Sequence, residues 1–462
     1  MRPILLVCAI ALFTVVTLVV AAGFISFDFL WFLFACTVFV TALCVASPLA
    51  GSTLISSRRS FLTLTLVIWI FLMISEGIFV HPSDTSSAVG GKFGASAYFE
   101  AASWILSFAA LAFITWFRPT YLRRAFTGPL KWASIFAIVA VLSCPISPVL
   151  TYSCAMAFKL CLIVVALIAI DGTMEGLLGI ETLFSALLIG TLVLTFAGFV
   201  TPFLRTQSVF NGDHFGAVIG LSGNAGLLLL LSTLYFLLKK NPWFLLVGVF
   251  SLVLMMLVGG KGGIAASFLS FIAFFAFLKS ARQALAACAG LAVIFVLCVA
   301  FTPFGHDLQR YGESGNAATL SGRTQLWTDV WPEIMKRPVF GHGYRASRFV
   351  SAEVEGAFAE AGHIHNSFLE TLYNNGVAGL IPILIMSYVI VVNLGSVLRR
   401  HLAARERYFA ATALALYLHL LVWGMTAPTF GGTPDNRFMT FFALLPISIH
   451  LRAHVEREMS NA

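Results

Sequence analysis

Long apolar runs alternate with short polar loops along nearly the whole chain. Many of these runs approach the roughly 20 apolar residues that a membrane-spanning helix needs. They predict about 12–14 spanning helices and hence an all-α integral membrane protein. The run over residues 4–22 resembles a secretion signal, but the next apolar run begins almost at once, so we interpret it as the first span.

One extended polar region interrupts this pattern, from about Thr302 to Asn366. Long connections in compact proteins are usually functional, so we expect an outer loop that contains short helices of its own. The chain accordingly divides into four segments. Residues 1–200 hold N-terminal spans, 201–301 hold spans with cationic outer turns, 302–366 form the large loop, and 367–462 hold C-terminal spans.

Composition strengthens the membrane assignment. The 462 residues are 59% hydrophobic and 10% charged, with a mean hydropathy of +0.94. Soluble domains carry about 25% charged residues, so an ordinary soluble protein is excluded. The eight cysteines all lie in apolar runs without the spacing of zinc ligands, which favours a packing role.

The net charge of +8 is spread over alternate loops. Cytoplasmic loops of membrane proteins carry the excess of Lys and Arg, so we expect both termini in the cytoplasm and the large loop outside. The charge therefore indicates topology and not a nucleic-acid partner. The basic loops hold Arg2, Arg58, Arg59, Arg118, Arg123, Arg124, Lys131, Lys239, Lys240, Lys279, Arg282, Arg399, Arg400, Arg405, Arg407, Arg452 and Arg457, and the opposite short loops hold Lys92, Arg205, Lys261 and Arg437.

The large loop contains a predicted amphipathic helix and a tight turn. Ser321 suits the cap at the start of this helix. Gly341 and Gly343 mark the turn, where the backbone can approach a ligand closely. The apolar residues at helical spacing are Leu326, Trp327, Val330, Trp331 and Ile334.

His365 and Asn366 stand just before another predicted helix. Ser367 and Glu370 have the spacing of a capping box, so we expect Glu370 to cap the helix, with a catalytic role as the alternative. The helix is expected to end at the Asn-Asn-Gly sequence of residues 374–376. Its start favours anions such as phosphate and disfavours an imidazolium ion. His365 is therefore expected to be neutral and able to accept a proton.

Three cations are candidates for binding a diphosphate. Lys261 stands among four glycines in residues 259–263, Arg205 is the only basic residue of the outer loop 201–214, and Arg323 precedes the amphipathic helix. Together they would supply fixed donors to a departing diphosphate. A lysine snorkelling on a flexible turn and a solvated surface arginine are the alternatives.

Weaker candidates lie nearby. His342 and Arg345 suit an acceptor groove, although a turn beside a basic helix explains them equally well. His363 is a possible assistant to His365, and two neighbouring histidines are often surface polar residues. Lys159 lies within a span, where an ionisable group is a functional candidate by default, but it is close enough to the outer end to snorkel.

No metal ion or other cofactor is expected. A diphosphate leaving group normally invites Mg²⁺, which prefers carboxylate ligands. The outer loops carry no Asp-x-Asp pattern: Asp28 and Asp84 are isolated, and Glu353 and Glu355 suit a solvated helix face. These features favour metal-independent chemistry.

Four short patterns follow one another in the second half of the chain. They are S-G-R-x-x-x-W from Ser321, P-x-x-G-x-G from Pro338, H-N-x-x-L-E from His365 and G-x-x-G-L from Gly376. In this order they resemble the O-antigen ligase/polymerase superfamily, which includes O-antigen ligases and exopolysaccharide repeat-unit polymerases. The resemblance covers residues from about 205 to 380.

This resemblance implies a C-type glycosyltransferase fold with many spans, no metal ion and an undecaprenyl-diphosphate-linked glycan as donor. It also implies that His365 is the histidine of the family's loop and that Arg205 and Lys261 occupy its cationic positions. Members commonly have Ser-Arg where this chain has Gly260-Lys261. The change conserves charge but loses bidentate geometry.

The expected reaction is a single inverting displacement at the periplasmic face of a bacterial inner membrane. His365 takes a proton from an acceptor hydroxyl, which attacks the anomeric carbon of the donor. The acceptor is either lipid A-core or a growing polysaccharide. The alternatives are a transporter or flippase of lipid-linked glycans and a membrane assembly scaffold. The residues expected to bind the departing diphosphate are Arg205, Lys261, Arg323 and Asn366.

Reporter fusions test the expected topology. A reporter that is active only in the cytoplasm should be inactive when fused after Gly315 and active when fused at Ala462, because the basic loops place the large loop outside and the C-terminus inside. Cytoplasmic activity at Gly315 would overturn this topology.

Overall fold

A computed structural model describes much of the chain. The described residues are 58–79, 103–112, 120–206, 215–258, 260–279, 282, 285, 289, 290, 293, 296, 323–352, 364–400, 402–432 and 434–461. Every regular element in these ranges is a helix. The first two expected spans, Ser321 and His363 lie outside the described residues.

Within the described ranges, five helices are long and apolar enough to cross a membrane. Shorter apolar helices accompany them, and together they confirm an all-α integral membrane protein. The total number of spans stays a prediction. The five long segments are Leu150–Thr173 in α8, Gly176–Phe199 in α9, Gly220–Lys239 in α10, Ser367–Leu398 in α17 and Asn436–Asn461 in α19.

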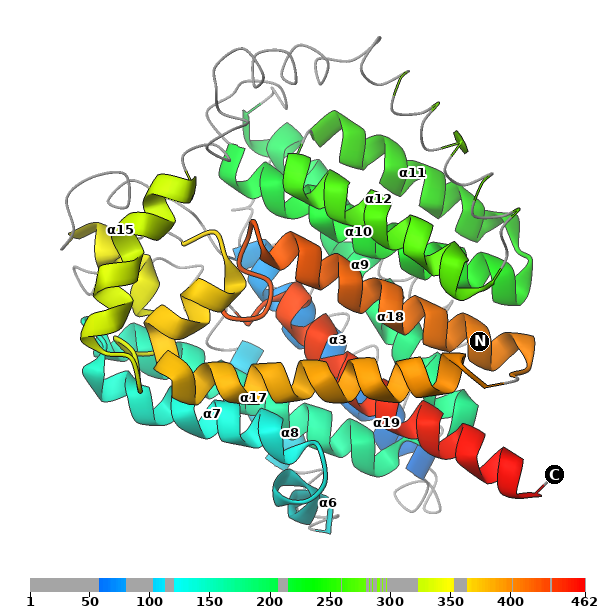
Figure 1. Cartoon of the computed structure of the whole chain (residues 1–462), viewed down its shortest axis with the longest axis horizontal. Coiled ribbons are helices and arrows are strands. Elements are labelled where there is room, and N and C mark those ends of the chain that lie inside the picture. Colours follow the sequence, from blue (N-terminus) through cyan, green and yellow to red (C-terminus); the bar gives the residue numbers. More distant parts are fainter. Residues whose placement is uncertain are drawn as a thin grey trace.

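Two buried helices occupy the middle of the bundle (Figure 1). Helix α18 (Ala404–Gly424) packs against α10, α12, α17 and α19, and α19 also packs against α3, α8 and α9. Small residues let α10 approach its neighbours closely, because a side chain at Gly223 would overlap the ring of Trp423. The remaining helices of this bundle are α3 (Arg58–Phe79), α7 (Lys131–Ser143), α8 (Leu150–Thr173), α9 (Gly176–Thr206), α10 (Phe215–Lys239), α11 (Pro242–Val258), α12 (Lys261–Phe277) and α17 (Ser367–Leu398).

Ion pairs join the helices at one end of the bundle. Asp171 at the end of α8 pairs with Arg124 through Nη1 and with His450 of α19 through Nε2, both at 2.9 Å. Glu181 near the start of α9 pairs with Lys239 of α10 and Arg405 of α18. Arg124, Lys239 and Arg405 belong to the set of loops that the charge pattern assigns to one side. The opposite end carries the described part of the large loop, which includes α15.

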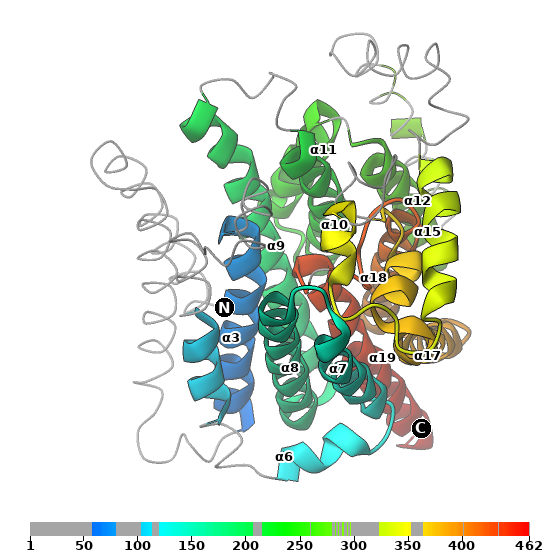
Figure 2. The same cartoon turned by 90° about the vertical axis from the view of Figure 1, so that its left-hand side faces the viewer.

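The loop's amphipathic helix is present as α15 (Arg323–Lys336). Leu326, Val330 and Ile334 are buried against the segment that leads into α17, whereas Trp331 is 48% exposed. The apolar face is therefore narrower than the sequence predicted. Figure 2 shows α15 beside α17 at the edge of the bundle.

Helix α17 is broken at Gly376, which has φ +62° and ψ −164°. The expected helix end at residues 374–376 is thus an interruption, and the helix resumes at once and continues to Leu398. A break of this kind frees backbone groups that need partners in a buried place. The P-x-x-G-x-G segment of residues 338–343 supplies them.

Four backbone hydrogen bonds join this segment to the two sides of the break. The glycines make the approach possible, because a Cβ at Gly341 would lie 2.6 Å from the backbone of Asn374 and one at Gly376 would overlap the backbone of Val339. The bonds are His342 N–H to Tyr373 O at 2.8 Å, Gly343 N–H to Asn374 O at 3.0 Å, Val377 N–H to Pro338 O at 2.8 Å and Ala378 N–H to Val339 O at 3.0 Å.

Candidate functional site

The loop that joins α18 to α19 holds two helix starts together. This α18–α19 loop, residues 425–432 and 434–435, packs on α12 through Thr426, which contacts the position where Gly262 would carry a side chain. It packs on α17 through Ser367, whose Oγ donates to Ala427 O at 3.0 Å and accepts from Thr429 N–H at 2.7 Å. Lys261 is the first residue of α12, and His365 lies just before α17. The starts of both helices therefore contact the same α18–α19 loop.

Asn366 is the residue that caps α17. Its Oδ1 accepts hydrogen bonds from the N–H groups of Phe368 at 3.0 Å and Leu369 at 3.1 Å. The predicted capping box of Ser367 and Glu370 is therefore wrong, because the Ser367 hydroxyl is used by the α18–α19 loop. The two N–H groups that Asn366 caps already have partners, so they are not open donors for a phosphate.

His365 has an uncommon backbone conformation, with φ +52°. The left-handed region costs a non-glycine residue about 1–2 kcal/mol, although histidine enters it more often than most. Such positions persist only where their surroundings hold them, and they gather at functional sites. Next to it, the indole Nε1 of Trp327 donates to Ile364 O at 3.0 Å, which ties the histidine segment to α15.

The His365 ring is half-buried, and its pKa is lowered to about 4. Burial is the larger cause, because it disfavours the charged imidazolium, and the positive charge of Arg323 is the second. The ring is thus neutral near pH 7. The sequence anticipated a neutral ring, but it attributed this to the start of α17 and did not foresee the charge of Arg323.

Arg345 and Glu370 form an ion pair in the interior. Arg345 Nη1 lies 3.1 Å from Glu370 Oε1, and both side chains are 0% exposed. Ser347 Oγ donates to the same oxygen at 3.2 Å. Glu370 is therefore neither a cap nor exposed. The expected groove role of Arg345 is also wrong, because a fully buried guanidinium does not line an open surface.

His342 joins α15 to α17. Its Nε2 lies 2.9 Å from Glu333 O, so this nitrogen carries the proton, because a carbonyl oxygen accepts. Its ring stacks on Tyr373 at 4.4 Å between centroids. These contacts hold the 338–343 segment against both helices, which leaves the proposed acceptor-groove role of His342 without support from this geometry.

Lys261 is the first residue of α12, after Gly260 as N-cap. The neighbouring glycines have a packing purpose that the sequence did not reveal, because a side chain at Gly263 would overlap Ser222 of α10. Ser222 Oγ donates to Gly260 O at 3.3 Å. Lys261 is half-buried where α10, α12 and the α18–α19 loop meet.

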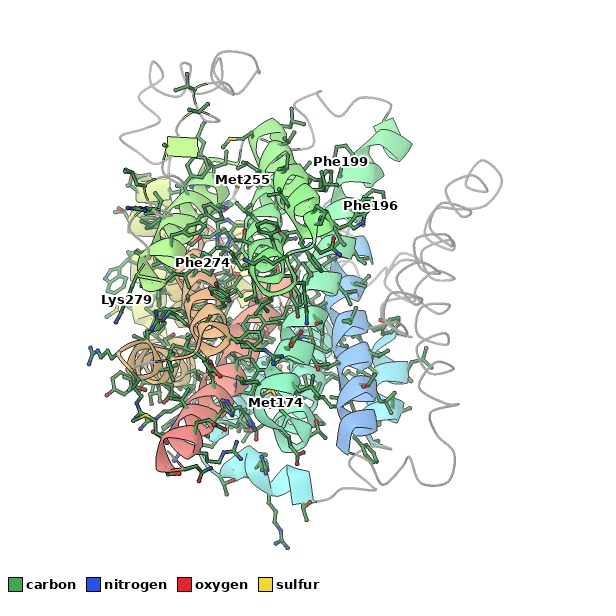
Figure 3. The ribbon with its side chains drawn as sticks, turned by 90° about the vertical axis from the view of Figure 1, so that its right-hand side faces the viewer. Met174, Phe196, Phe199, Met255, Phe274 and Lys279 are labelled. Atoms are coloured by element: carbon green, nitrogen blue, oxygen red, sulfur yellow. The ribbon has the colours of Figure 1, made fainter. Side chains whose placement is uncertain are left out.

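Arg205 belongs to the last turn of α9, so the expected outer loop begins later than predicted. Figures 2 and 3 show the last turns of α9, marked by Phe196 and Phe199, extending away from α15. The structure thus places Arg323 and His365 together and places Lys261 at the start of α12, which packs on the α18–α19 loop. The end of α9 lies apart from α15.

Sequence reasoning gave no role in the site to several polar residues at this end of the bundle. Asp435 immediately precedes α19, and Arg437 lies in its first turn. Tyr152 OH lies 3.5 Å from Arg345 Nη2. The Gly431-Gly432 pair followed by Asp435 before an apolar run was the available signal for a loop and a capped helix. Lys159, noted as an intramembrane candidate, is fully buried, with Nζ 5.5 Å from the ring centre of Trp104.

Comparison with known families gives this arrangement its context. The model of the O-antigen ligase family matches residues 246–384. This segment of the chain is therefore similar to O-antigen ligases. The matched segment contains most of α11, then α12, α15 and the start of α17, and with them Lys261, Arg323 and His365. No curated protein matches the chain.

The family supports a multi-pass membrane enzyme of the ligase or polymerase kind, which handles lipid-linked glycans and polysaccharides. The matched segment ends at residue 384, before the α18–α19 loop. That loop nevertheless contacts both matched helix starts, so residues outside the family match shape the site.

Truncation of Glu370 tests the buried pair. Glu370→Ala is expected to lower the free energy of unfolding by about 3–5 kcal/mol, because it leaves the Arg345 guanidinium buried without its carboxylate. Thermal unfolding of the purified protein in detergent measures this loss. The capping role would cost about 0.5–2 kcal/mol, so a loss in that range contradicts the assignment.

The matched control is Glu333→Ala. Glu333 pairs with Lys336 at 2.7 Å on α15, with the Lys336 side chain 65% exposed. Solvent screens such a pair, so this variant is expected to lose about 0–1 kcal/mol.

Proposed function

We propose that this enzyme transfers a glycan from an undecaprenyl-diphosphate-linked donor to a hydroxyl acceptor at the periplasmic face of a bacterial inner membrane. The proposal rests on one observation above all: a half-buried, neutral His365 beside Arg323, within the segment that matches the O-antigen ligase family. A neutral imidazole can accept a proton, and the adjacent cation suits an anionic donor.

The proposed step is one inverting displacement. The acceptor hydroxyl oxygen forms a bond to the anomeric carbon, and its proton passes to His365. The bond between that carbon and the diphosphate oxygen breaks, and the electron pair leaves with the lipid diphosphate. Lys261 and Arg323 stabilise this charge as it develops.

Donor binding also changes the pKa of His365, the proposed base. A group with a pKa of about 4 is a weak base near neutral pH, and general bases work best with a pKa near the working pH. The charge of Arg323 contributes to the low pKa of His365, and a bound diphosphate offsets that charge. The pKa of His365 then rises toward the range that catalysis needs.

Other parts of the proposal rest on the sequence. They are the use of Arg205 and Asn366 in diphosphate binding, the independence from metal ions, and an acceptor that is either lipid A-core or a growing polysaccharide. Ligase and polymerase share the donor chemistry and differ in the acceptor. An assembly scaffold would use the loop as a docking surface, and neither a scaffold nor a flippase needs His365 as a proton acceptor.

Substitution of His365 distinguishes these functions. His365→Asn should accumulate normally, because asparagine tolerates the left-handed backbone, and should lose about 10²–10⁴-fold in transfer rate, because its amide does not serve as a base. The assay uses purified protein with a lipid-linked donor. Arg337→Ala, an exposed change just after α15, is the matched control and should keep its rate. A near-normal rate for His365→Asn would refute the base assignment.

A further inference from the structure

Arg437 is held in one orientation at the start of α19. Its Nε and Nη2 both donate to Asp435 Oδ2. The other oxygen of Asp435 accepts from the N–H groups of Arg437 at 2.9 Å and Phe438 at 3.1 Å, so the carboxylate itself is fixed by the helix. The guanidinium also lies over the ring of Trp423, 5.0 Å from its centre. Arg437 is therefore oriented before any ligand arrives.

In this orientation, N–H groups of the Arg437 guanidinium remain available to bind a ligand. A guanidinium carries five N–H groups, and Asp435 uses one on Nε and one on Nη2. Among the described residues, Nη1 of Arg437 has no hydrogen-bond partner, and the side chain is 19% exposed. Adjacent N–H groups on a planar fork match the oxygens of a phosphate.

The position of Arg437 connects it to the site already described. Trp423, under the guanidinium, packs on Gly223, and the Gly223 amide nitrogen lies 2.9 Å from where a Cβ of Gly263 would stand. Arg437 is therefore linked through Trp423 and Gly223 to the first turn of α12, which begins with Lys261. In the other direction, its charge acts on Glu370 at the start of α17.

We propose that Arg437 binds a phosphate of the lipid-linked donor beside Lys261, with Asp435 and Trp423 as positioning residues. This inference rests on the proposed function and adds to it a donor-binding residue outside the segment that matches the family. Asp435 balances the charge of Arg437, so Lys261 and Arg323 supply the net positive charge of the site. Arg437 supplies directed N–H groups.

The test measures binding of undecaprenyl diphosphate and the kinetics of glycan transfer on the full-length protein in detergent. Arg437→Gln is expected to weaken binding and to raise the donor KM by about tenfold or more, because charge-assisted hydrogen bonds are lost. Arg437→Lys should not restore either value, because a point charge lacks the fork. Asp435→Asn should raise the donor KM less than Arg437→Gln does, because it loosens the guanidinium without removing it.

Arg452→Gln is the matched control. Arg452 lies on the same helix at the opposite end and donates through Nε to Glu456 Oε1 at 2.8 Å. This variant should bind and transfer as the wild type does. If Arg437→Gln does not accumulate, donor binding and transfer are measured on Arg437→Lys instead. This variant keeps a cation over Trp423 and should therefore fold.

Two outcomes separate the inference from the proposed function. If the wild type transfers glycan while Arg437→Gln, or Arg437→Lys in its place, binds and transfers normally, the role of Arg437 is refuted and the proposed function stands. If the wild type binds undecaprenyl diphosphate but transfers nothing from the lipid-linked donor, the proposed function is refuted. Weakened binding by the Arg437 variants supports the inference, and normal binding with lost transfer by His365→Asn supports the proposed function.

Discussion

The insertion of residues 338–343 into the break of α17 is the interaction on which the site depends. Four backbone hydrogen bonds satisfy groups that the broken helix would otherwise leave unpaired in a buried place. This close fit needs glycine at 341 and 376, where the backbones touch. With this segment in place, Arg345 forms an ion pair with Glu370. The His342 ring stacks on Tyr373 of α17, and its Nε2 donates to Glu333 O of α15. These contacts fix α17 to α15, and Arg323 at the start of α15 therefore lies close to His365, just before α17.

The electrostatics of the site follow from this arrangement. A buried ion pair gains little stability over apolar packing, but loss of one partner is costly, so the Arg345–Glu370 pair disfavours any displacement of the inserted segment. At the surface of the same unit, His365 is kept neutral by partial burial and by Arg323. The α18–α19 loop joins this unit to the start of α12 through Ser367 and Thr426. Cationic groups and a neutral imidazole therefore occupy one end of the bundle, and the proposed transfer from an anionic lipid-linked donor relies on this arrangement.

The sequence revealed what local patterns encode. Hydropathy gave the all-α membrane fold, helical spacing gave α15, and the residues around His365 marked a helix start. It did not reveal choices made by distant contacts. Asn366 and Ser367 are both good caps, and the partner of Ser367 lies some 60 positions away, at Ala427 and Thr429. The spacing of Glu370 from Ser367 suits a capping box, but the ion pair of Glu370 with Arg345 is a contact that local spacing does not encode. Residues 374–376 signalled a helix end, because the segment that bridges the break comes from another part of the chain. Arg437 follows the α18–α19 loop, and only the packing of the helices shows that this loop contacts the starts of α12 and α17.

The pH dependence of transfer tests most directly whether a neutral His365, restrained by Arg323, is the base. A base must be unprotonated, so the rate falls as pH drops through its pKa. The kcat/KM for donor reports the free enzyme, and kcat reports the complex. Measured from about pH 3.5 to about pH 8, kcat/KM should fall only as pH drops toward about 4, while kcat should fall at a higher pH because the bound diphosphate offsets Arg323. A kcat/KM that already falls near the ordinary histidine value of about 6.5, or that shows no fall at either pH, would contradict this account.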